Sequence, residues 1–139
     1  MGDDAGPSHV RRIVPDLAVA DPAVDTGFWT GVLGLETAFD GGRIVNHRVP
    51  GSPATQVQLI SRDATAPEDA AVSVEVDSSA TLAATHARAV AAGLEIVHPL
   101  TDEAWGVRRF FVRTPGGVVV NVLTHLPDPD PHPHPDRQP

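Results

Sequence analysis

The tripeptide "GLE" occurs twice in this 139-residue chain, at residues 34–36 and at residues 93–95. Upstream of the two copies stand "LAV" at residues 17–19 and "VEV" at residues 74–76, to within two residues of the same spacing. Each pair brackets a segment with helical features, and glycine commonly follows the end of a helix. The repetition indicates that one structural unit occurs twice.

The first unit opens with a strand pattern over residues 12–20. Asp21 is a suitable helix N-cap and Pro22 suits the first helical turn. The sequence therefore predicts a single helix that begins here and ends at Gly34. The apolar positions of that helix recur at four-residue steps, at Val24, Phe28 and Val32, and three strand-like runs follow it, "ETAF", "RIVNHRV" and "TQVQLIS".

The second unit repeats this plan. The run "AVSVEV" at residues 71–76 alternates as a strand does. Ser78 or Ser79 can cap the helix that follows, and Gly93 can end it. The strand-like runs after that helix are "LEIVHPL", "RRFFVR" and "VVVNVLT". Both units thus have the order β-α-β-β-β, which predicts an α+β fold of two βαβββ modules.

Composition along the chain predicts five parts, because proline-rich or small polar stretches separate the periodic segments. The parts are a flexible tail over residues 1–10, the first module over 11–60, a linker over 61–70, the second module over 71–126 and a proline-rich disordered tail over 127–139.

The composition also limits the chemistry of the chain. The net charge of -8 argues against binding to nucleic acid or to an anionic membrane, since both need a basic surface. There is no lysine and no cysteine, which excludes lysine Schiff bases, thiol nucleophiles and disulfides. The acidic N-terminus lacks the apolar core of a signal peptide. We therefore expect a cytoplasmic protein.

One helix covers only one face of each small sheet, so strand alternation decides which side chains lie on the other face. On this basis Asp16, Gln58, Glu75 and Asn121 share the face turned away from the helices. Their neighbours on that face are small or aliphatic residues. A semi-polar face of this kind predicts a ligand cavity with a few convergent polar groups. The alternative is a plain solvated sheet face.

Three segments carry a resemblance to a known family: "FWTGVLGLE" at 28–36, "AWGVRRFFVRTPGG" at 104–117 and "VVVNVLTH" at 118–125. They are similar to segments of the vicinal oxygen chelate superfamily, which includes glyoxalase I, bleomycin-resistance proteins and extradiol dioxygenases. Thr114 stands where the turn of that family usually has Asp. The resemblance spans residues 11–125 and implies modules curled into a U-shaped open barrel, with chains paired as homodimers.

The resemblance also implies where a metal would be bound. Metal-dependent members of the family use one ligand on the first strand of each module and one on the last. Matched to those patterns, the positions hold Val14, Gln56 or Gln58, Ala71 and Asn121. Aliphatic side chains cannot coordinate a cation, and neutral amides are poor ligands for divalent metals. We therefore expect a retained cavity without a metal or other cofactor. A divalent metal held by an unusual set of ligands is the alternative.

The segment "EAWGVRRFF" supplies the first candidates for ligand binding. Trp105 stands at the mouth of a strand, where its flat ring suits an aromatic ligand. Alternation sends one of Arg108 and Arg109 toward the cavity, where it can hold an anionic group. Phe39 and His47, in the strands of the first module, are further candidates.

The carboxyl groups of Asp16 and Glu75 allow two interpretations. They can act as general acid and base if burial separates their pKa values, or they can be solvated or paired with arginine. The retained cavity predicts a protein that binds a small, partly aromatic molecule without a metal, as the resemblance to sequestration-type resistance proteins implies. The alternative is a lyase, isomerase or dioxygenase of the same superfamily.

Overall fold

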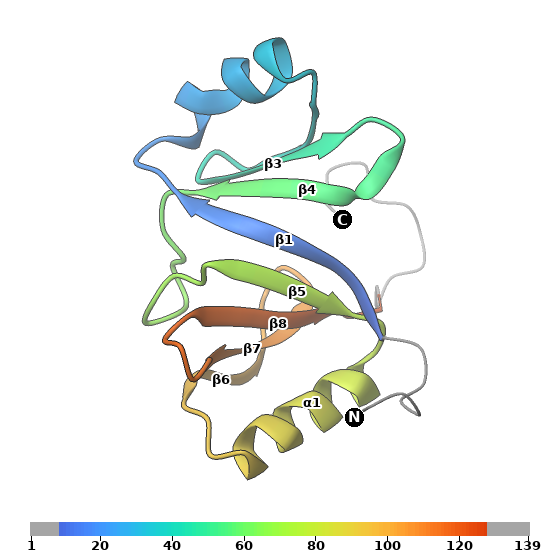
Figure 1. Cartoon of the computed structure of the whole chain (residues 1–139), viewed down its shortest axis with the longest axis vertical. Helices are drawn as coiled ribbons and strands as arrows, with labels where there is room; N and C mark the ends of the chain where they lie inside the picture. The colour runs from blue at the N-terminus through green and yellow to red at the C-terminus, as the bar shows by residue number, and fades with distance from the viewer. Residues whose placement is uncertain (1–8, 128–139) are drawn as a thin grey trace.

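The computed structural model describes residues 9–127, in which eight strands form one sheet with one α-helix and two short helical turns (Figure 1). The predicted α+β fold of two βαβββ modules is confirmed, since each module gives a strand, a helical segment and three further strands. The strands are β1 (Val10–Ala18), β2 (Glu36–Asp40), β3 (Ile44–Val49), β4 (Ser52–Ile60), β5 (Val72–Val76), β6 (Ile96–Asp102), β7 (Val107–Arg113) and β8 (Val119–His125).

The two predicted tails fall almost entirely outside the described residues, which do not include 1–8 and 128–139. Strand β1 begins at Val10, the last residue of the predicted N-terminal tail. The backbone carbonyl of His9 also accepts a hydrogen bond from the N–H of Asp77 at 3.0 Å, so the ordered sheet reaches to this residue.

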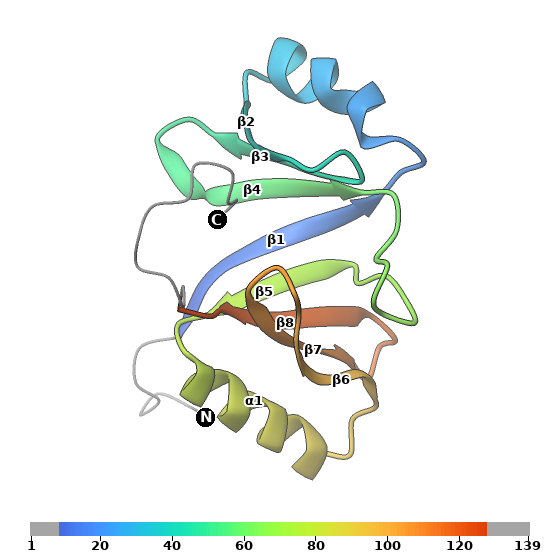
Figure 2. The same ribbon diagram turned by 180° about the vertical axis from the view of Figure 1, so that it is seen from behind.

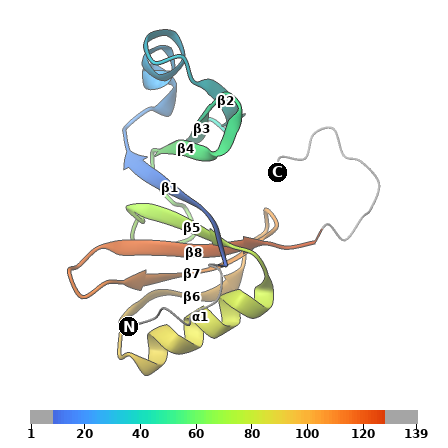
Figure 3. The ribbon, with the colours of Figure 1, turned by 45° about the vertical axis from the view of Figure 1, so that its right-hand side comes forward.

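Two parallel strand pairs define the modules: β1 with β4 in the first, and β5 with β8 in the second. All other neighbours are antiparallel, in the order β2-β3-β4-β1-β5-β8-β7-β6. The modules join where β1 pairs with β5, with Ile13 opposite Val74 and Val14 opposite Ser73. The sheet curves around this seam and stays open at its two edges, β2 and β6 (Figure 3).

Helix α1 (Ser79–Ala91) covers the outer face of the second module (Figure 3). Ser78 caps it as predicted, since its hydroxyl oxygen accepts a hydrogen bond from the N–H of Thr81 at 3.1 Å. Leu82 and Ala89 face the sheet, and the buried side chains packed with them are Val76, Phe110, Val112 and Val122. Within residues 9–127, no helix has the length and apolar character needed to cross a membrane.

The helix predicted for the first module is confirmed as a helical segment over residues 22–32, but two short irregular turns make up most of it in place of a regular α-helix (Figure 2). They are η1 (Pro22–Asp25), a 3₁₀-helix, and η2 (Phe28–Val32), a π-helix. Asp21 caps η1 as predicted, since its side chain accepts a backbone N–H at 3.1 Å. Gly27 and Gly31 lie within the segment and favour its departure from a regular α-helix, because each glycine disfavours an α-helix by about 1 kcal/mol relative to alanine.

These turns contact the first module chiefly at β2 and β3 and leave part of its outer face uncovered. Trp29 stacks on His47 of β3, with ring centroids 6.4 Å apart. Two apolar side chains of β1 stay accessible to solvent: Leu17 is 40% exposed, and Ile13 is 58% exposed. The turns expose four more apolar side chains, those of Val24, Phe28, Val32 and Leu33.

The packing of α1 predicts a large effect of truncation on one of its faces and a small effect on the other. We expect Leu82→Ala to lower the free energy of unfolding by about 2–5 kcal/mol, because the fully buried side chain would leave a cavity against Phe110. Val90→Ala in the same helix is the control, since Val90 is exposed and should change stability by less than about 1 kcal/mol. Urea denaturation followed by circular dichroism measures both, and equal losses would contradict the assigned packing.

Candidate functional site

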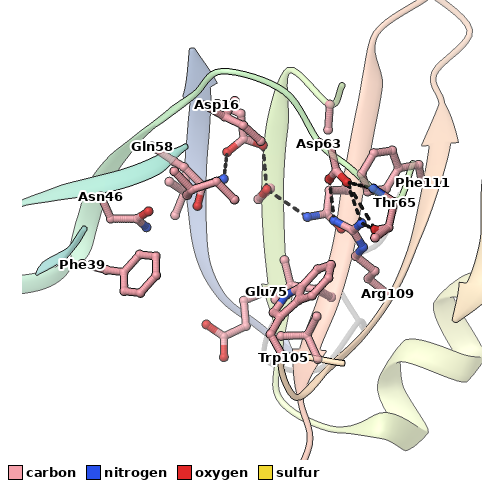
Figure 4. A pocket seen from close by; sticks show the side chains of 18 of the residues that line it. Asp16, Phe39, Asn46, Gln58, Asp63, Thr65, Glu75, Trp105, Arg109 and Phe111 are labelled. Atoms are coloured by element: carbon pink, nitrogen blue, oxygen red, sulfur yellow. Dashed lines mark hydrogen bonds and ion pairs between the residues drawn. The ribbon is translucent and has the colours of Figure 1, made fainter. Parts of the chain in front are cut away.

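A cavity of about 370 Å³ lies on the sheet face turned away from α1, and both modules line it. Figure 4 shows Phe39 and Asn46 approaching from the first module, with Trp105, Arg109 and Phe111 opposite them from the second. The predicted sorting of faces places the polar residues correctly: Asp16, Gln58, Glu75 and Asn121 all line this cavity.

The floor of the cavity is a chain of four hydrogen-bonded polar side chains, which we call the floor quartet: Asp16, Gln58, Ser73 and Asn121. Gln58 Nε2 donates to Asp16 Oδ1 at 2.9 Å, and Ser73 Oγ donates to Asp16 Oδ2 at 2.6 Å. Asn121 Nδ2 in turn donates to Ser73 Oγ at 3.1 Å. Strand pairing causes this convergence, because Asp16 lies opposite Gln58 and Ser73 lies opposite Asn121.

Asp16 is the electrostatically unusual member of the floor quartet. Burial raises the pKa of its carboxyl group from 3.8 to about 7, although the hydrogen bonds from Ser73 and Gln58 act in the opposite direction. The group therefore changes charge near neutral pH inside the cavity. A carboxyl group in this state can take up or release a proton beside a bound molecule.

The floor quartet takes one side chain from the first and last strands of each module, β1, β4, β5 and β8. These are the strands on which the family resemblance places metal ligands. The match to the family pattern placed the metal-ligand positions at Val14 of β1 and at Ala71, just before β5. The structure instead brings together Asp16 and Ser73, each two residues later in the sequence. The matching lacked the strand register, which decides which residues meet.

The floor quartet does not fit a divalent metal. It offers one carboxylate, two neutral amides and a hydroxyl group, and these groups already hydrogen-bond one another. Divalent metals of this family's type prefer several carboxylate or imidazole ligands. Nowhere in residues 9–127 do three or more His, Cys, Asp or Glu side chains gather in a way that could hold a metal ion.

Arg109 is the buried cation of the cavity wall. Its guanidinium group donates two hydrogen bonds to Asp63, at 2.8 and 3.0 Å, one to Glu103 at 2.7 Å and one to Thr65 at 2.7 Å. His98 also contacts Glu103, at 3.0 Å. Burial alone would raise the pKa of Asp63, but hydrogen bonding and the charge of Arg109 outweigh it and lower that pKa. The network fastens the linker to the second module.

Aromatic rings form the remaining walls. The guanidinium carbon of Arg109 lies 5.0 Å from the ring centroid of Trp105 and 4.8 Å from that of Phe111. Trp105 belongs to a tight turn closed by a hydrogen bond from Gly106 N to Glu103 O at 3.1 Å. Gly106 has a φ of 92°, a conformation that favours glycine and sets where Trp105 emerges. Trp105 is 54% exposed, so a face of the ring is open to a ligand.

Glu75 lies at the rim of the cavity and is paired. Arg12 and His125 both contact its carboxylate, His125 at 3.0 Å. The hydrogen bond from His125 lowers the pKa of Glu75, and the nearby charge of Arg12 lowers it further, against the opposing effect of burial. The sequence offered Asp16 and Glu75 as a possible acid and base pair, and the pKa of Asp16 is raised while that of Glu75 is lowered.

Two residues proposed from the sequence lie away from the cavity. His47 is buried on the opposite face of β3, where its Nδ1 contacts the hydroxyl of Thr37 at 3.2 Å and its ring stacks on Trp29. Burial lowers the pKa of His47. Arg108 points outward and pairs with Asp102. The predicted alternation of the two arginines is thus observed, with Arg109 as the inward one, but its charge is already compensated by the protein.

Sequence reasoning missed several residues that line the cavity. Asp63 and Thr65 come from the predicted linker, which has no periodic pattern from which their direction could be read. Phe111 could have been found, because it shares the strand face of Arg109. Four further charged or polar lining residues that the sequence did not single out are Arg12, Arg43, Asn46 and Arg62.

The duplicated βαβββ order, the open curved sheet and the cavity between the modules define a protein of the vicinal oxygen chelate fold. The chain belongs to the glyoxalase/bleomycin resistance protein/dioxygenase superfamily, whose sequence profile matches residues 6–122. No curated protein sequence matches the chain.

Solved structures of this fold have differing activities. A superfamily member from Vibrio splendidus 12B01 is 21% identical with a TM-score of 0.56, covering 81% of this chain and 97% of its own. Methylmalonyl-CoA epimerase from Mycobacterium tuberculosis is 24% identical with a TM-score of 0.62, covering 88% and 93%. An extradiol ring-cleaving dioxygenase from B. fuscum is 17% identical with a TM-score of 0.62, covering 88% and 35%. At these identities the likeness establishes the fold and leaves the activity open.

The Arg109 network predicts that two adjacent arginines contribute very differently to stability. We expect Arg109→Gln to lower the free energy of unfolding by about 3–5 kcal/mol, because it leaves the buried carboxylates of Asp63 and Glu103 without the compensating charge of Arg109. Arg108→Gln should cost less than about 1 kcal/mol, since its ion pair with Asp102 is exposed. Denaturant titration of the two variants provides the comparison, and similar costs would contradict the assigned roles.

The raised pKa of Asp16 predicts a particular dependence of stability on pH. The folded state holds the proton more tightly than the unfolded state, so this contribution is complete below about pH 4 and is lost as the pH rises through about 7. Asp16→Asn should abolish it, so the variant should gain stability relative to the natural protein between about pH 4 and pH 8, by at most about 4 kcal/mol. Urea titrations across this range measure the difference, and a constant difference would show that Asp16 is not a strongly perturbed group.

Proposed function

We propose that this protein binds a small, partly aromatic molecule in the cavity without a metal ion, as a binding or sequestration protein. The observation that carries the proposal is a cavity of about 370 Å³ with the aromatic rings of Phe39 and Trp105 in its lining. This volume is near the lower end of the range of about 300–1,000 Å³ typical of small-molecule sites, which suits a ligand of one or two rings.

The state of the polar lining supports binding by shape and stacking. The carboxylates of Asp63 and Glu75 are paired with arginine, and the members of the floor quartet are bonded to one another. The open ring of Trp105 is the best placed aromatic surface for a ligand. Stacking on such a ring contributes favourably to affinity beyond the area it buries.

A homodimer is part of the proposal, since the family resemblance implies it. The exposed apolar side chains Ile13, Leu17, Phe28 and Val32 support an association surface on the first module, because apolar side chains gain most when removed from water. A cytoplasmic location stays a prediction from the sequence.

The alternative is an enzyme of the same superfamily, a lyase, isomerase or dioxygenase. The opposite pKa shifts of Asp16 and Glu75 favour a proton-transferring member of that group, because acid and base pairs arise where environments separate two pKa values. Conversion of a bound molecule that is lost in Asp16→Asn would support this alternative.

The binding proposal predicts that Trp105 anchors the ligand. Trp105→Ala should weaken binding of one- and two-ring aromatic probes by roughly 1–3 kcal/mol, because the ring covers the bound molecule. Isothermal titration calorimetry measures the affinity, with Arg108→Ala as the control because Arg108 points away from the cavity. A chelator should leave the affinity unchanged if no metal takes part. Unchanged affinity in Trp105→Ala would remove this ring from the site, and chelator-sensitive binding would favour the metal-dependent alternative.

A further inference from the structure

Arginine is concentrated in the cavity lining of a chain that is acidic as a whole. Four of the chain's 10 basic residues line the cavity, whereas only three of its 18 acidic residues do. Arginines therefore outnumber carboxyl groups in the lining, although the net charge of the chain is -8. The contrast raises the question of which of these arginines the protein itself compensates.

Two of the four lining arginines are paired with protein carboxylates. Arg109 pairs with Asp63 and Glu103, and Arg12 pairs with Glu75. Their charges are therefore compensated within the protein, and they hold the wall and the rim of the cavity in place. The positive charge that is left for a ligand belongs to the other two.

Arg43 and Arg62, which we call the unpaired arginines, are exposed and line the cavity. Neither forms an ion pair or a side-chain hydrogen bond within residues 9–127. The carboxylate nearest in sequence to Arg62 is that of Asp63, and both of its oxygens accept hydrogen bonds from Arg109. The one nearest in sequence to Arg43 is that of Asp40, which accepts a backbone N–H at 2.9 Å.

Strand pairing brings the unpaired arginines together at one end of the first module. The backbone carbonyl of Arg43 accepts a hydrogen bond from Ser61 N at 2.9 Å, and Arg62 is the next residue along. Arg62 also continues the alternation of Gln58 and Ile60, which both line the cavity. Two guanidinium groups thus start from neighbouring backbone positions beside the same cavity.

An aromatic surface of the cavity lies next to the unpaired arginines. The ring of Phe39 packs over the turn that leads to Arg43, since a methyl group added to Gly41 would lie 2.9 Å from the ring carbon Cε2. Trp105 faces the cavity from the other module (Figure 4). A planar ligand that contacts Phe39 therefore lies in the part of the cavity that the unpaired arginines border.

We propose that the cavity takes an aromatic anion, whose ring contacts Phe39 and Trp105 and whose carboxylate or phosphate group binds the unpaired arginines. The inference rests on the proposed function, because it adds a charged group to the aromatic ligand proposed there. A guanidinium group donates two parallel hydrogen bonds to such a group, which fixes its direction as well as its charge. The anion-binding role predicted for Arg108 or Arg109 thus falls to arginines that the protein leaves uncompensated.

Three probes with the same two-ring body test the inference: 2-naphthoate, 2-naphthyl phosphate and 2-naphthamide. The amide has nearly the shape of the carboxylate but carries no charge. Calorimetry at about pH 6, where Asp16 mostly holds its proton, should show at least one anion binding about tenfold tighter than the amide. The tighter anion identifies the group that the site takes. Raising the salt concentration from about 50 to about 500 mM should reduce the preference at least about twofold.

Replacing the unpaired arginines provides a matched comparison. The double variant Arg43→Gln and Arg62→Gln should lose the preference for the anion and keep its affinity for 2-naphthamide, because both side chains are exposed and make no contact that holds the fold. Arg88→Gln is the control, since it removes the same charge from an exposed position on α1, on the other side of the sheet. It should keep the preference, and circular dichroism confirms that each variant is folded.

The outcomes separate this inference from the proposed function. If 2-naphthamide binds as tightly as both anions, or if the preference persists in the double variant, the inference is overturned while the proposed function stands. An equal loss of preference in Arg88→Gln would also overturn it, because it would report only the net charge of the chain. If none of the three probes binds at about millimolar concentration, the proposed function fails together with the inference.

Discussion

The antiparallel pairing of β1 with β5 is the constraint on which the cavity depends. It joins two modules that would otherwise each present a half-covered sheet, and its register sets Val14 opposite Ser73. Because side chains alternate along a strand, a shift of one residue between β1 and β5 would turn Asp16 and Ser73 to opposite faces of the sheet. The floor quartet exists only in the observed register, since its hydrogen bonds cross from β4 through β1 and β5 to β8.

Two buried charged groups sit on this sheet in opposite electrostatic conditions. Arg109 has Asp63 and Glu103 as direct partners and aromatic rings on two sides, so its charge is well compensated. Asp16 receives only neutral donors, and burial therefore outweighs them and raises its pKa to about 7. The ion pairs of Arg109 hold the cavity wall in place. The carboxyl group of Asp16 has no such partner, so its charge responds to its surroundings. This contrast makes Asp16 the chemically adaptable part of the site.

The duplicated fold was predictable because its signals are local. Strand alternation in "VSVEV", the Ser78 cap and the repeated "GLE" all follow from neighbouring residues, and the second module forms as they indicate. The helix of the first module was predicted in the right place, but its irregular form was not predicted, because its four-residue apolar spacing has Gly27 and Gly31 within it and little sheet beneath it. Helices in proteins gain most of their stability from packing, so spacing alone was insufficient there.

The candidate site was predicted in part. Alternation sorted Asp16, Gln58, Glu75 and Asn121 onto the cavity face, since it depends only on position along a strand. It could not assign His47, because the direction of this side chain follows from its pairing with Val57 of β4, and the sequence does not reveal which residues of two strands are paired.

The amino-acid sequence by itself determined the two modules, their strands, the polar residues of the inner face and the absence of thiol and lysine chemistry, because these depend on residue type and local spacing. Tertiary structure alone decided which residues meet. Strand register joined Asp16 to Ser73 rather than leaving Val14 and Ala71 at the centre. The fold of the linker brings Asp63 and Thr65 to Arg109. These residues are separated from Arg109 by 46 and 44 positions in the sequence, so the contacts arise only when the chain is folded.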